Sequence, residues 1–309
     1  MKRNLLLLLS VALTAACGSD KKADYSWLTS NEVRVAVDAT FEPIMAEQVQ
    51  QFALSYVEAD MQPLYCSEDS ALRLLLADSV RSAIVTRKLT EGEKKKILAA
   101  GHSASQSLIA SDAFALIVNR QNTDSIISLE ELKGIVNGDI TKWEQLSHGQ
   151  KRGPVSLVFD NSASSTVRYM RDSLCGGRQL EGNVFAQGTN KAVIEIVKQN
   201  PNAIGVVGTD WLREDTNVLP NFDSLPVKVM MVSRSNADER HFRPYQYYIA
   251  TGQYPLVRPV YAITTDPRTK SMERNFYFWL KGQKGQLIFC NNSQLLPTMP
   301  VQVRAVNAH

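Results

Sequence analysis

The sequence predicts an α/β fold, because short β-branched segments alternate along the chain with segments whose apolar residues recur at helical spacing. Polar loops join most of these predicted strands to the helix that follows, an order typical of mainly parallel sheets. The chain has 309 residues, of which 44% are hydrophobic and 21% are charged, which is ordinary for a globular protein. That length accommodates one large domain or two domains of roughly 100 to 150 residues each.

The first half of the chain contains three strand–loop–helix units and then a more apolar strand. Pro43, in the first turn of the first predicted helix, fits a helix start, and the capping box Thr90-x-x-Glu93 opens the third helix. The continuous apolar run 113–119 predicts a buried strand. The expected strands of the three units are 33–37, 61–65 and 82–85, and the first two helices are 44–57 and 71–77.

The second half of the chain continues the alternation with a fourth such unit. The capping box Ser128-x-x-Glu131 opens a helix that ends at Gly138. The fourth unit consists of a strand, a Ser-rich loop and a helix, at 155–159, 160–166 and 167–174. The remaining predicted segments are a helix at 191–199, strands at 203–207 and 257–264, and a final helix from 275 to 281 with an extension to 289.

The N-terminus has the features of a signal peptide. Lys2 and Arg3 precede the apolar run 5–13, which is too short to span a bilayer. The small residues before Cys17 resemble a bacterial lipobox, in which the cysteine is acylated, although Thr14 stands where that pattern prefers Leu. The alternatives to acylation are that the protein is simply secreted or that Cys17 is a buried cysteine. We therefore expect an exported, membrane-anchored lipoprotein that faces the periplasm or the cell exterior, with a signal peptide at 1–16 and a lipid-anchored tether at 17–25.

Charge and the spacing of potential metal ligands exclude several function classes. The net charge of +3 is close to neutral, and the longest basic run, 94–96, fits a solvated helix face, so we expect no nucleic-acid partner. The histidines are too scattered for a metal cluster and the cysteines too far apart for a zinc knuckle or a redox pair, so we expect no metal and no cofactor. One disulfide is compatible with an oxidising compartment, and its pairing stays open. The residues concerned are His102, His148, His241 and His309 and, beyond Cys17, Cys66, Cys175 and Cys290.

The loops that follow the predicted strands are the candidate binding site. In an open α/β sheet, ligands bind at the carboxyl ends of the strands. The helix starts found there offer unpaired N–H groups and the positive end of a dipole, which suit an anion. The loop 160–166 is the richest of these, and both an anion site and a capped, solvated turn stay open for it. Its hydroxyl side chains belong to Ser162, Ser164, Ser165 and Thr166.

An ordered set of motifs resembles the phosphate-binding proteins of bacterial ABC transporters, a periplasmic type with two lobes and a hinge. The match covers most of the mature chain in order. The matching segments are Thr40-Phe41 for the family's Thr-Phe pair, 112–119 for its hinge strand, 138–143 for its Gly-x-Ile-x-x-Trp motif, 163–166 for its Gly-Ser-Gly-Thr loop, and Ile204-Gly205-Val206 and Tyr254-Pro255-Leu256 for two later segments.

The resemblance implies a two-lobed periplasmic-binding-protein fold, in which each lobe is a mainly parallel sheet flanked by helices and two strands form the hinge. Lobe I would comprise 26–115 and 240–309, and lobe II would comprise 116–239. The resemblance also implies that hydroxyl or backbone N–H groups of two loops contact the ligand, together with a serine of a third loop. These residues are Thr40 and Phe41, then Ser164, Ser165 and Thr166, and Ser67 or Ser70.

The charged residues depart from the family pattern. The family places an Asp after the third strand and an Arg before the Ser-rich loop, whereas this sequence has Arg87 and Asp160 there. Our hypothesis is that Arg87 binds the oxyanion, because its fork of donors suits two oxygens of one phosphate, and that Asp160 orients it. The alternative is an exposed loop cation and a helix N-cap. Arg168, one turn into the next helix, is a second candidate.

These observations predict an extracytoplasmic solute-binding lipoprotein. It would capture an oxyanion between two lobes, with inorganic phosphate expected, and deliver it to an ABC transporter permease. An enzyme is not expected, because the sequence has no Gly-x-Ser-x-Gly elbow, no His-Glu-x-x-His motif and no histidine beside the Ser-rich loop. The alternatives are the binding of another oxyanion, and a surface lipoprotein of the same fold whose altered pocket makes it a sensor or an adhesion partner.

Overall fold

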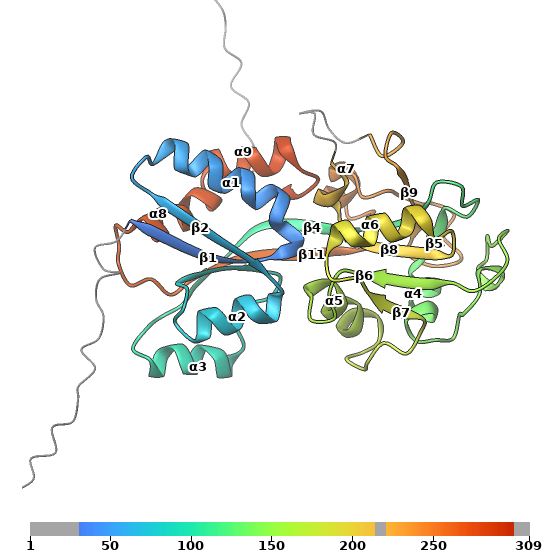
Figure 1. The fold of residues 1–309 in the computed structure, drawn as a ribbon, viewed down its shortest axis with the longest axis horizontal. Coiled ribbons are helices and arrows are strands. Elements are labelled where there is room, and N and C mark those ends of the chain that lie inside the picture. Colours follow the sequence, from blue (N-terminus) through green and yellow to red (C-terminus); the bar gives the residue numbers. More distant parts are fainter. Residues whose placement is uncertain (1–30, 214–220, 300–309) are drawn as a thin grey trace, which may run out of the picture. The chain divides into compact units, whose positions relative to one another are not determined.

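A computed structural model describes residues 31–213 and 221–299, so the predicted signal peptide and the tether with Cys17 lie outside the described residues. Helices pack on both faces of a mixed sheet (Figure 1), which confirms the α/β prediction. The strand order is β2 (Asp60–Cys66), β1 (Glu32–Asp38), β3 (Ser82–Val85), β11 (Val257–Thr264), β4 (Ser105–Asn119), β8 (Ala203–Gly208), β6 (Ser156–Phe159) and β7 (Val184–Ala186). In addition, β9 (Val227–Val229) and β12 (Leu296–Pro297) pair with β4, and β5 (Ile126–Ser128) pairs with β10 (Met231–Ser233).

The long strand β4 runs through both halves of the sheet. It pairs with β11 up to Ala113 and with β8 from Phe114 onward. The segment that leads into β11 passes the same point, where the Phe114 amide donates to the Leu256 carbonyl oxygen over 3.0 Å. Two neighbouring segments therefore connect the halves, and the predicted two-lobed fold with a two-strand hinge is confirmed.

The lobe built on β1, β2 and β3 has helices on both faces of its sheet (Figure 1). Successive side chains of a strand point to opposite faces. Accordingly, Val35 and Val37 of β1 pack with apolar residues of α1, α8 and α9, whereas Ala36 packs with those of α2 and α3. These helices are α1 (Glu42–Ser55), α2 (Glu68–Leu76), α3 (Glu91–Ala99), α8 (Met272–Lys281) and α9 (Gln283–Asn292).

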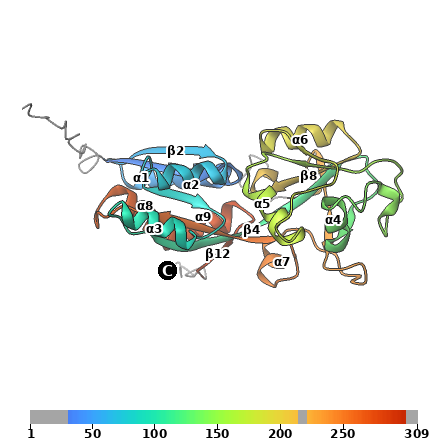
Figure 2. The ribbon, with the colours of Figure 1, turned by 90° about the horizontal axis from the view of Figure 1, so that it is seen from below.

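The second lobe repeats this arrangement around the other half of β4. Leu116 and Val118 pack with apolar residues of α4 and α5, and Ala115 and Ile117 pack with those of α6. Figure 2 shows α4 and α6 on opposite sides of β8. The helices of this region are α4 (Leu129–Val136), α5 (Ser165–Leu174), α6 (Asn190–Gln199) and the short α7 (Gln246–Ala250).

The direction of strand pairing separates the hinge from the rest of the sheet. The pairs β1–β2, β1–β3, β6–β7 and β6–β8 are parallel, as the alternating pattern predicts. Each antiparallel pair in the described residues involves β4 or β11. The chain leaves the first lobe on β4 and returns on β11, so each lobe combines parallel strands with antiparallel hinge strands.

Local sequence signals set most helix boundaries. Both predicted capping boxes, at the starts of α3 and α4, are formed. The predicted final helix at 275–281 is confirmed within α8, but its extension to 289 forms a separate helix, because the chain turns at Gly282 and continues as α9 packed closely on α8. A Cβ atom at Gly285 would lie 2.4 Å from the Trp279 carbonyl oxygen, so this close packing requires glycine.

The described part of the chain shows the state of three cysteines and the character of its helices. Cys66, Cys175 and Cys290 are free thiols there. None of the helices in residues 31–213 and 221–299 has both the length and the apolar character needed to cross a membrane.

Candidate functional site

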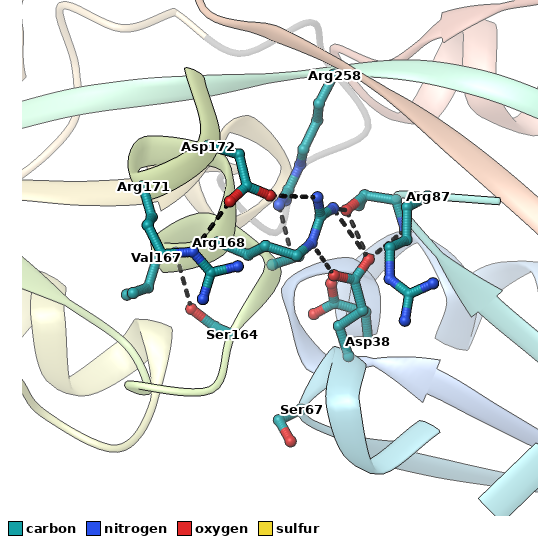
Figure 3. A network of polar contacts seen from close by, with 12 residues as sticks. Asp38, Ser67, Arg87, Ser164, Val167, Arg168, Arg171, Asp172 and Arg258 are labelled. Carbon is teal, nitrogen blue, oxygen red and sulfur yellow. Dashed lines mark hydrogen bonds and ion pairs between the residues drawn. The ribbon is translucent and has the colours of Figure 1, made fainter. Parts of the chain in front are cut away.

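Buried polar side chains gather where the two lobes meet at the carboxyl ends of β1, β3 and β6 (Figure 3). Each of them is no more than 4% exposed. Buried polar groups are normally hydrogen-bonded, so such a concentration requires a mutual network or a ligand. The residues are Asp38, Thr40, Glu68, Thr86, Asp112, Asp160, Ser164, Ser165, Thr166 and Arg258.

Arg258 is the central cation of this cluster. It lies on β11 directly opposite Asp112 of β4, and its Nε donates to the Asp112 carboxylate over 2.9 Å. Its Nη1 donates to the Ser165 hydroxyl over 2.6 Å, and its guanidinium lies 4.1 Å from the ring centre of Phe114 and 5.0 Å from that of Phe41. The third nitrogen, Nη2, is buried with no hydrogen-bond partner among the described residues. Two hydrogen bonds and two aromatic rings thus position this guanidinium, while one of its nitrogens has no partner in the described chain.

The turn after β1 carries the first of the predicted ligand contacts. The Asp38 Oδ1 accepts from the Thr40 backbone amide over 3.0 Å and from the Thr40 hydroxyl over 2.9 Å, which fixes the turn. Its other oxygen, Oδ2, is buried without a partner in the described chain. Burial raises the pKa of Asp38 to about 6, and the charge of Glu68 adds to this effect while Arg258 opposes it.

The N-terminus of α5 brings the Ser-rich loop to the same place. Ser164 caps the helix, because its hydroxyl accepts from the Val167 amide over 3.3 Å (Figure 3). The Thr166 hydroxyl and one carboxylate oxygen of Asp160 are both buried without a hydrogen-bond partner among the described residues. Burial raises the pKa of Asp160, although hydrogen bonds from Ser164 and from the backbone lower it. The hydroxyl of Ser164 is therefore an ordinary cap, those of Ser165 and Thr166 are buried in the cluster, and Ser162 is exposed.

A second arginine joins the two lobes at the side of this cluster. Arg168 of α5 donates through Nε to Glu68 of α2 over 2.5 Å and through Nη2 to the Thr86 hydroxyl over 2.6 Å (Figure 3). Thr86 in turn donates through its amide and its hydroxyl to Glu68, each over 2.7 Å. Burial alone would raise the pKa of Glu68, but the hydrogen bonds and charge of Arg168 and the bonds from Thr86 hold it below its usual value.

The predicted pairing of Arg87 with Asp160 is wrong. Arg87 donates to both carboxylate oxygens of Glu93, each over 2.8 Å, and Asp160 lies near Asn190, whose amide nitrogen is 3.4 Å from its Oδ2. The reason is local, because Glu93 belongs to the capping box of α3, which begins just after the Arg87 loop. The guanidinium next to the Ser-rich loop comes instead from Arg258.

The two serines of the second loop have local partners. Ser67 caps α2, its hydroxyl donates to that of Ser70 over 2.9 Å, and Ser70 also accepts from Arg73 over 2.9 Å. In Figure 3, Ser67 lies apart from the contacts of Arg168 and Arg258. The structure thus brings Thr40, Phe41, Asp160 and the serines and threonine of 164–166 together around Arg258, and leaves Ser67, Ser70 and Arg87 outside this group. The ligand-binding roles of all these residues stay predictions.

Comparison with known proteins identifies the family. A family model described as the PBP superfamily domain matches residues 19–280. The chain belongs to this family. The phosphate-binding protein PstS of Staphylococcus saprophyticus is 23% identical over 260 residues, which cover 84% of this chain and 77% of the relative. The protein of the same name from Staphylococcus epidermidis is 21% identical over 263 residues, with the same coverage of both chains.

Solved structures share the fold of this chain. A putative phosphate ABC transporter substrate-binding protein from Clostridium perfringens superposes with a TM-score of 0.68 at 18% identity, covering 87% of this chain and all of that one. An ABC-type phosphate transport receptor from Vibrio cholerae superposes with a TM-score of 0.62 at 21% identity, covering 86% of this chain and all of that one. At these identities the similarity establishes the fold of this PBP superfamily member.

Sequence reasoning missed several residues of the site in this PBP superfamily protein. Arg258 lies in the predicted strand 257–264, and Asp112 begins the predicted hinge strand. Charged residues are rarely buried unless they are paired, so two opposite charges in predicted strands were an available signal. Asp38 precedes Thr40 by two residues and could have been recognised as a turn cap. Glu68 gave no such signal, because its role depends on Arg168, one hundred residues away.

Proposed function

We propose that this chain is an extracytoplasmic solute-binding protein that captures an oxyanion between its two lobes, and that the ion is inorganic phosphate. The observation that carries the proposal is the free Nη2 group of Arg258, buried beside Ser165 at the N-terminus of α5. A buried donor without a partner costs roughly 1 to 3 kcal/mol, and more when the group is charged. An oxyanion at a helix N-terminus would satisfy this donor and the helix amides together.

The surroundings of Arg258 suit the capture of such an ion. Asp112 and Ser165 hold its guanidinium in place, so little conformational entropy would be lost when a ligand binds. The hydroxyl of Thr166 supplies a further free donor, and the Thr40–Phe41 turn faces the same cluster. Closing the lobes would exclude water and strengthen each of these hydrogen bonds.

The carboxylates of the site favour phosphate over sulfate. Asp38 and Asp160 each have one buried oxygen without a partner among the described residues. Phosphate carries at least one proton near neutral pH and can donate a hydrogen bond to such an oxygen, whereas sulfate cannot and would be repelled. Rejection through a repelled or unpaired buried group can amount to several kcal/mol.

The relatives support the transport role. Several are named phosphate-binding protein PstS, and the Clostridium perfringens structure is described as a putative phosphate ABC transporter substrate-binding protein with bound phosphate. By analogy, an ABC permease is the partner that receives the ion. The lipobox-like segment at Cys17 supports attachment to the membrane through a lipid. Binding without catalysis fits the site, since Ser164 serves as a helix cap and Ser165 accepts from a guanidinium, so neither is paired with a general base.

Titration calorimetry with phosphate, sulfate and molybdate tests the proposal. The wild type should bind phosphate, and Arg258→Lys, which keeps the charge but loses the fork of donors, should bind it at least about 100-fold more weakly. Arg87→Lys is the matched control, because Arg87 is held by Glu93, and it should bind like the wild type. Heat from sulfate alone would overturn the phosphate assignment. If Arg258→Lys bound phosphate like the wild type and Arg87→Lys did not, Arg87 and not Arg258 would be the arginine that binds the ion.

A further inference from the structure

Helix α1 begins without a cap of its own. Its N-cap residue is Phe41, which offers no side-chain acceptor, although the first-turn amides of a helix need acceptors. A carboxylate from the other lobe lies at this position. Asp210, in the 3-10 turn η4 (Thr209–Leu212) after β8, is 1% exposed and interacts with the Ile44 amide in the first turn of α1. The turn that contains Thr40 and Phe41 is therefore stabilised from the opposite lobe.

Further contacts hold η4 and the segment just before it against the same turn. The Trp211 indole nitrogen donates to the Thr40 carbonyl oxygen over 2.8 Å. Arg213 pairs with Glu47 in the second turn of α1. A Cβ atom at Gly208 would lie only 2.7 Å from the Thr40 methyl group, so the approach of β8 to this turn requires glycine. The lobes thus meet closely on this side of the site, independently of the Arg168 contact.

The Asp210 carboxylate is only partly compensated in this contact. One oxygen accepts from Arg213 over 3.4 Å, and the other, Oδ2, is buried without a partner among the described residues. Among the described residues, two carboxylates also face it, Asp112 of β4 and Glu47 of α1. The negative charge of Asp210 is therefore stabilised by Arg213 and by the N-terminus of α1, and it is destabilised by two like charges and by the loss of hydration on burial.

We propose that Asp210 is a positioning residue that links closure of the lobes to pH, because closure buries its carboxylate against the Thr40–Phe41 turn and is accompanied by the uptake of a proton. This inference rests on the proposed function, since the turn it positions is part of the proposed oxyanion site. Asp210 itself does not contact the ion.

The direction of the pH effect follows from burial. In the closed arrangement burial raises the pKa of Asp210 to about 7, against the opposing effects of Arg213 and the Ile44 amide. Opening exposes the carboxyl to water and returns its pKa toward roughly 4. Between these values the closed state holds a proton that the open state lacks. Falling pH therefore favours closure and binding, rising pH opposes them, and the effect ends above about pH 7.

The test compares wild type with Asp210→Asn, which keeps the shape and the acceptor oxygen but cannot ionise. Phosphate affinity is measured by calorimetry from pH 5 to 8.5, and the ratio of the two affinities is taken at each pH. The titrations of phosphate and of Asp38 are common to both proteins and cancel in this ratio. The wild type should lose affinity relative to Asp210→Asn by up to about tenfold per pH unit between pH 5 and 7, and Asp210→Asn should bind at least as tightly at pH 8.

A purely structural cap gives a different result. Asp210→Asn would then bind more weakly by the same factor at every pH, and a constant ratio of this kind would overturn the inference. Small-angle X-ray scattering without phosphate separates this outcome from failure of the proposed function. The wild type should become more compact as the pH falls from 8 to 5, and Asp210→Asn should not. Absence of phosphate binding at every pH would refute the proposed function, while equal scattering of both proteins would refute the role of Asp210.

Discussion

Two arginines beside the Ser-rich loop form ion pairs that differ in burial. Arg258 and Asp112 face each other on the hinge strands, and both side chains are 1% exposed. Arg168 and Glu68 connect the two lobes, with side chains that are 22% and 1% exposed. A fully buried pair depends on both members, because either one alone leaves an uncompensated charge. A partly solvated pair can open at lower cost, which suits a contact that must break when the lobes separate.

The hinge pair should give the largest effect on stability. Asp112→Asn leaves the Arg258 guanidinium buried without its counter-charge, and we expect the free energy of unfolding to fall by about 3 to 5 kcal/mol. Chemical denaturation measures this value. The matched control is the double variant Asp112→Leu with Arg258→Met, which removes both charges. It should recover most of the stability, but it should not bind phosphate because the Arg258 guanidinium is absent. A double variant no more stable than Asp112→Asn would contradict the importance of the unpaired charge.

The pair between the lobes should give a smaller and pH-dependent effect. Glu68→Gln removes the charge that accepts from Arg168 and Thr86, and we expect a loss of about 1 to 3 kcal/mol at pH 7. Because the folded-state pKa of Glu68 is lowered, the carboxylate stabilises the fold above its unfolded pKa, and this contribution is lost as the pH falls through the folded value. Unfolding measured from pH 7 down to pH 3 should therefore show the two proteins converging in acid. A constant difference would mean that the charge of Glu68 is not responsible.

The contrast between these pairs also marks what could be read from the sequence. The α/β fold, the capping boxes of α3 and α4 and the Ser164 cap depend on residues a few positions apart, and they were predictable for that reason. The register that places Arg258 opposite Asp112 joins residues 146 positions apart, which no local pattern specifies. The error at Arg87 has the same origin, since the family pattern suggested a distant partner while a nearby capping carboxylate was available.

The coupling energies of the two ion pairs should also differ in their dependence on salt. At physiological ionic strength, screening acts over about 8 Å, and it reaches partly exposed charges far more than buried ones. The coupling energy between Arg168 and Glu68, obtained from a double-mutant cycle of Arg168→Ala and Glu68→Gln, should fall by about half between 0.05 and 0.5 M NaCl. The corresponding cycle for Arg258 and Asp112 should change little. Equal salt dependence in both cycles would remove the distinction drawn from burial.

The smallest effect is expected at Arg87, which serves as the reference for both pairs. Its bidentate contact with Glu93 lies within one lobe, and the two side chains are 26% and 16% exposed. Arg87 holds the pKa of Glu93 at about 2, yet a partly exposed pair of this kind contributes only about 0.5 to 1 kcal/mol because water screens it. Denaturation of Arg87→Ala at pH 7 should show a loss in that range, and phosphate affinity should be unchanged. A loss of stability as large as that of Asp112→Asn would mean that solvent exposure does not determine how much each of the three ion pairs contributes to the free energy of unfolding.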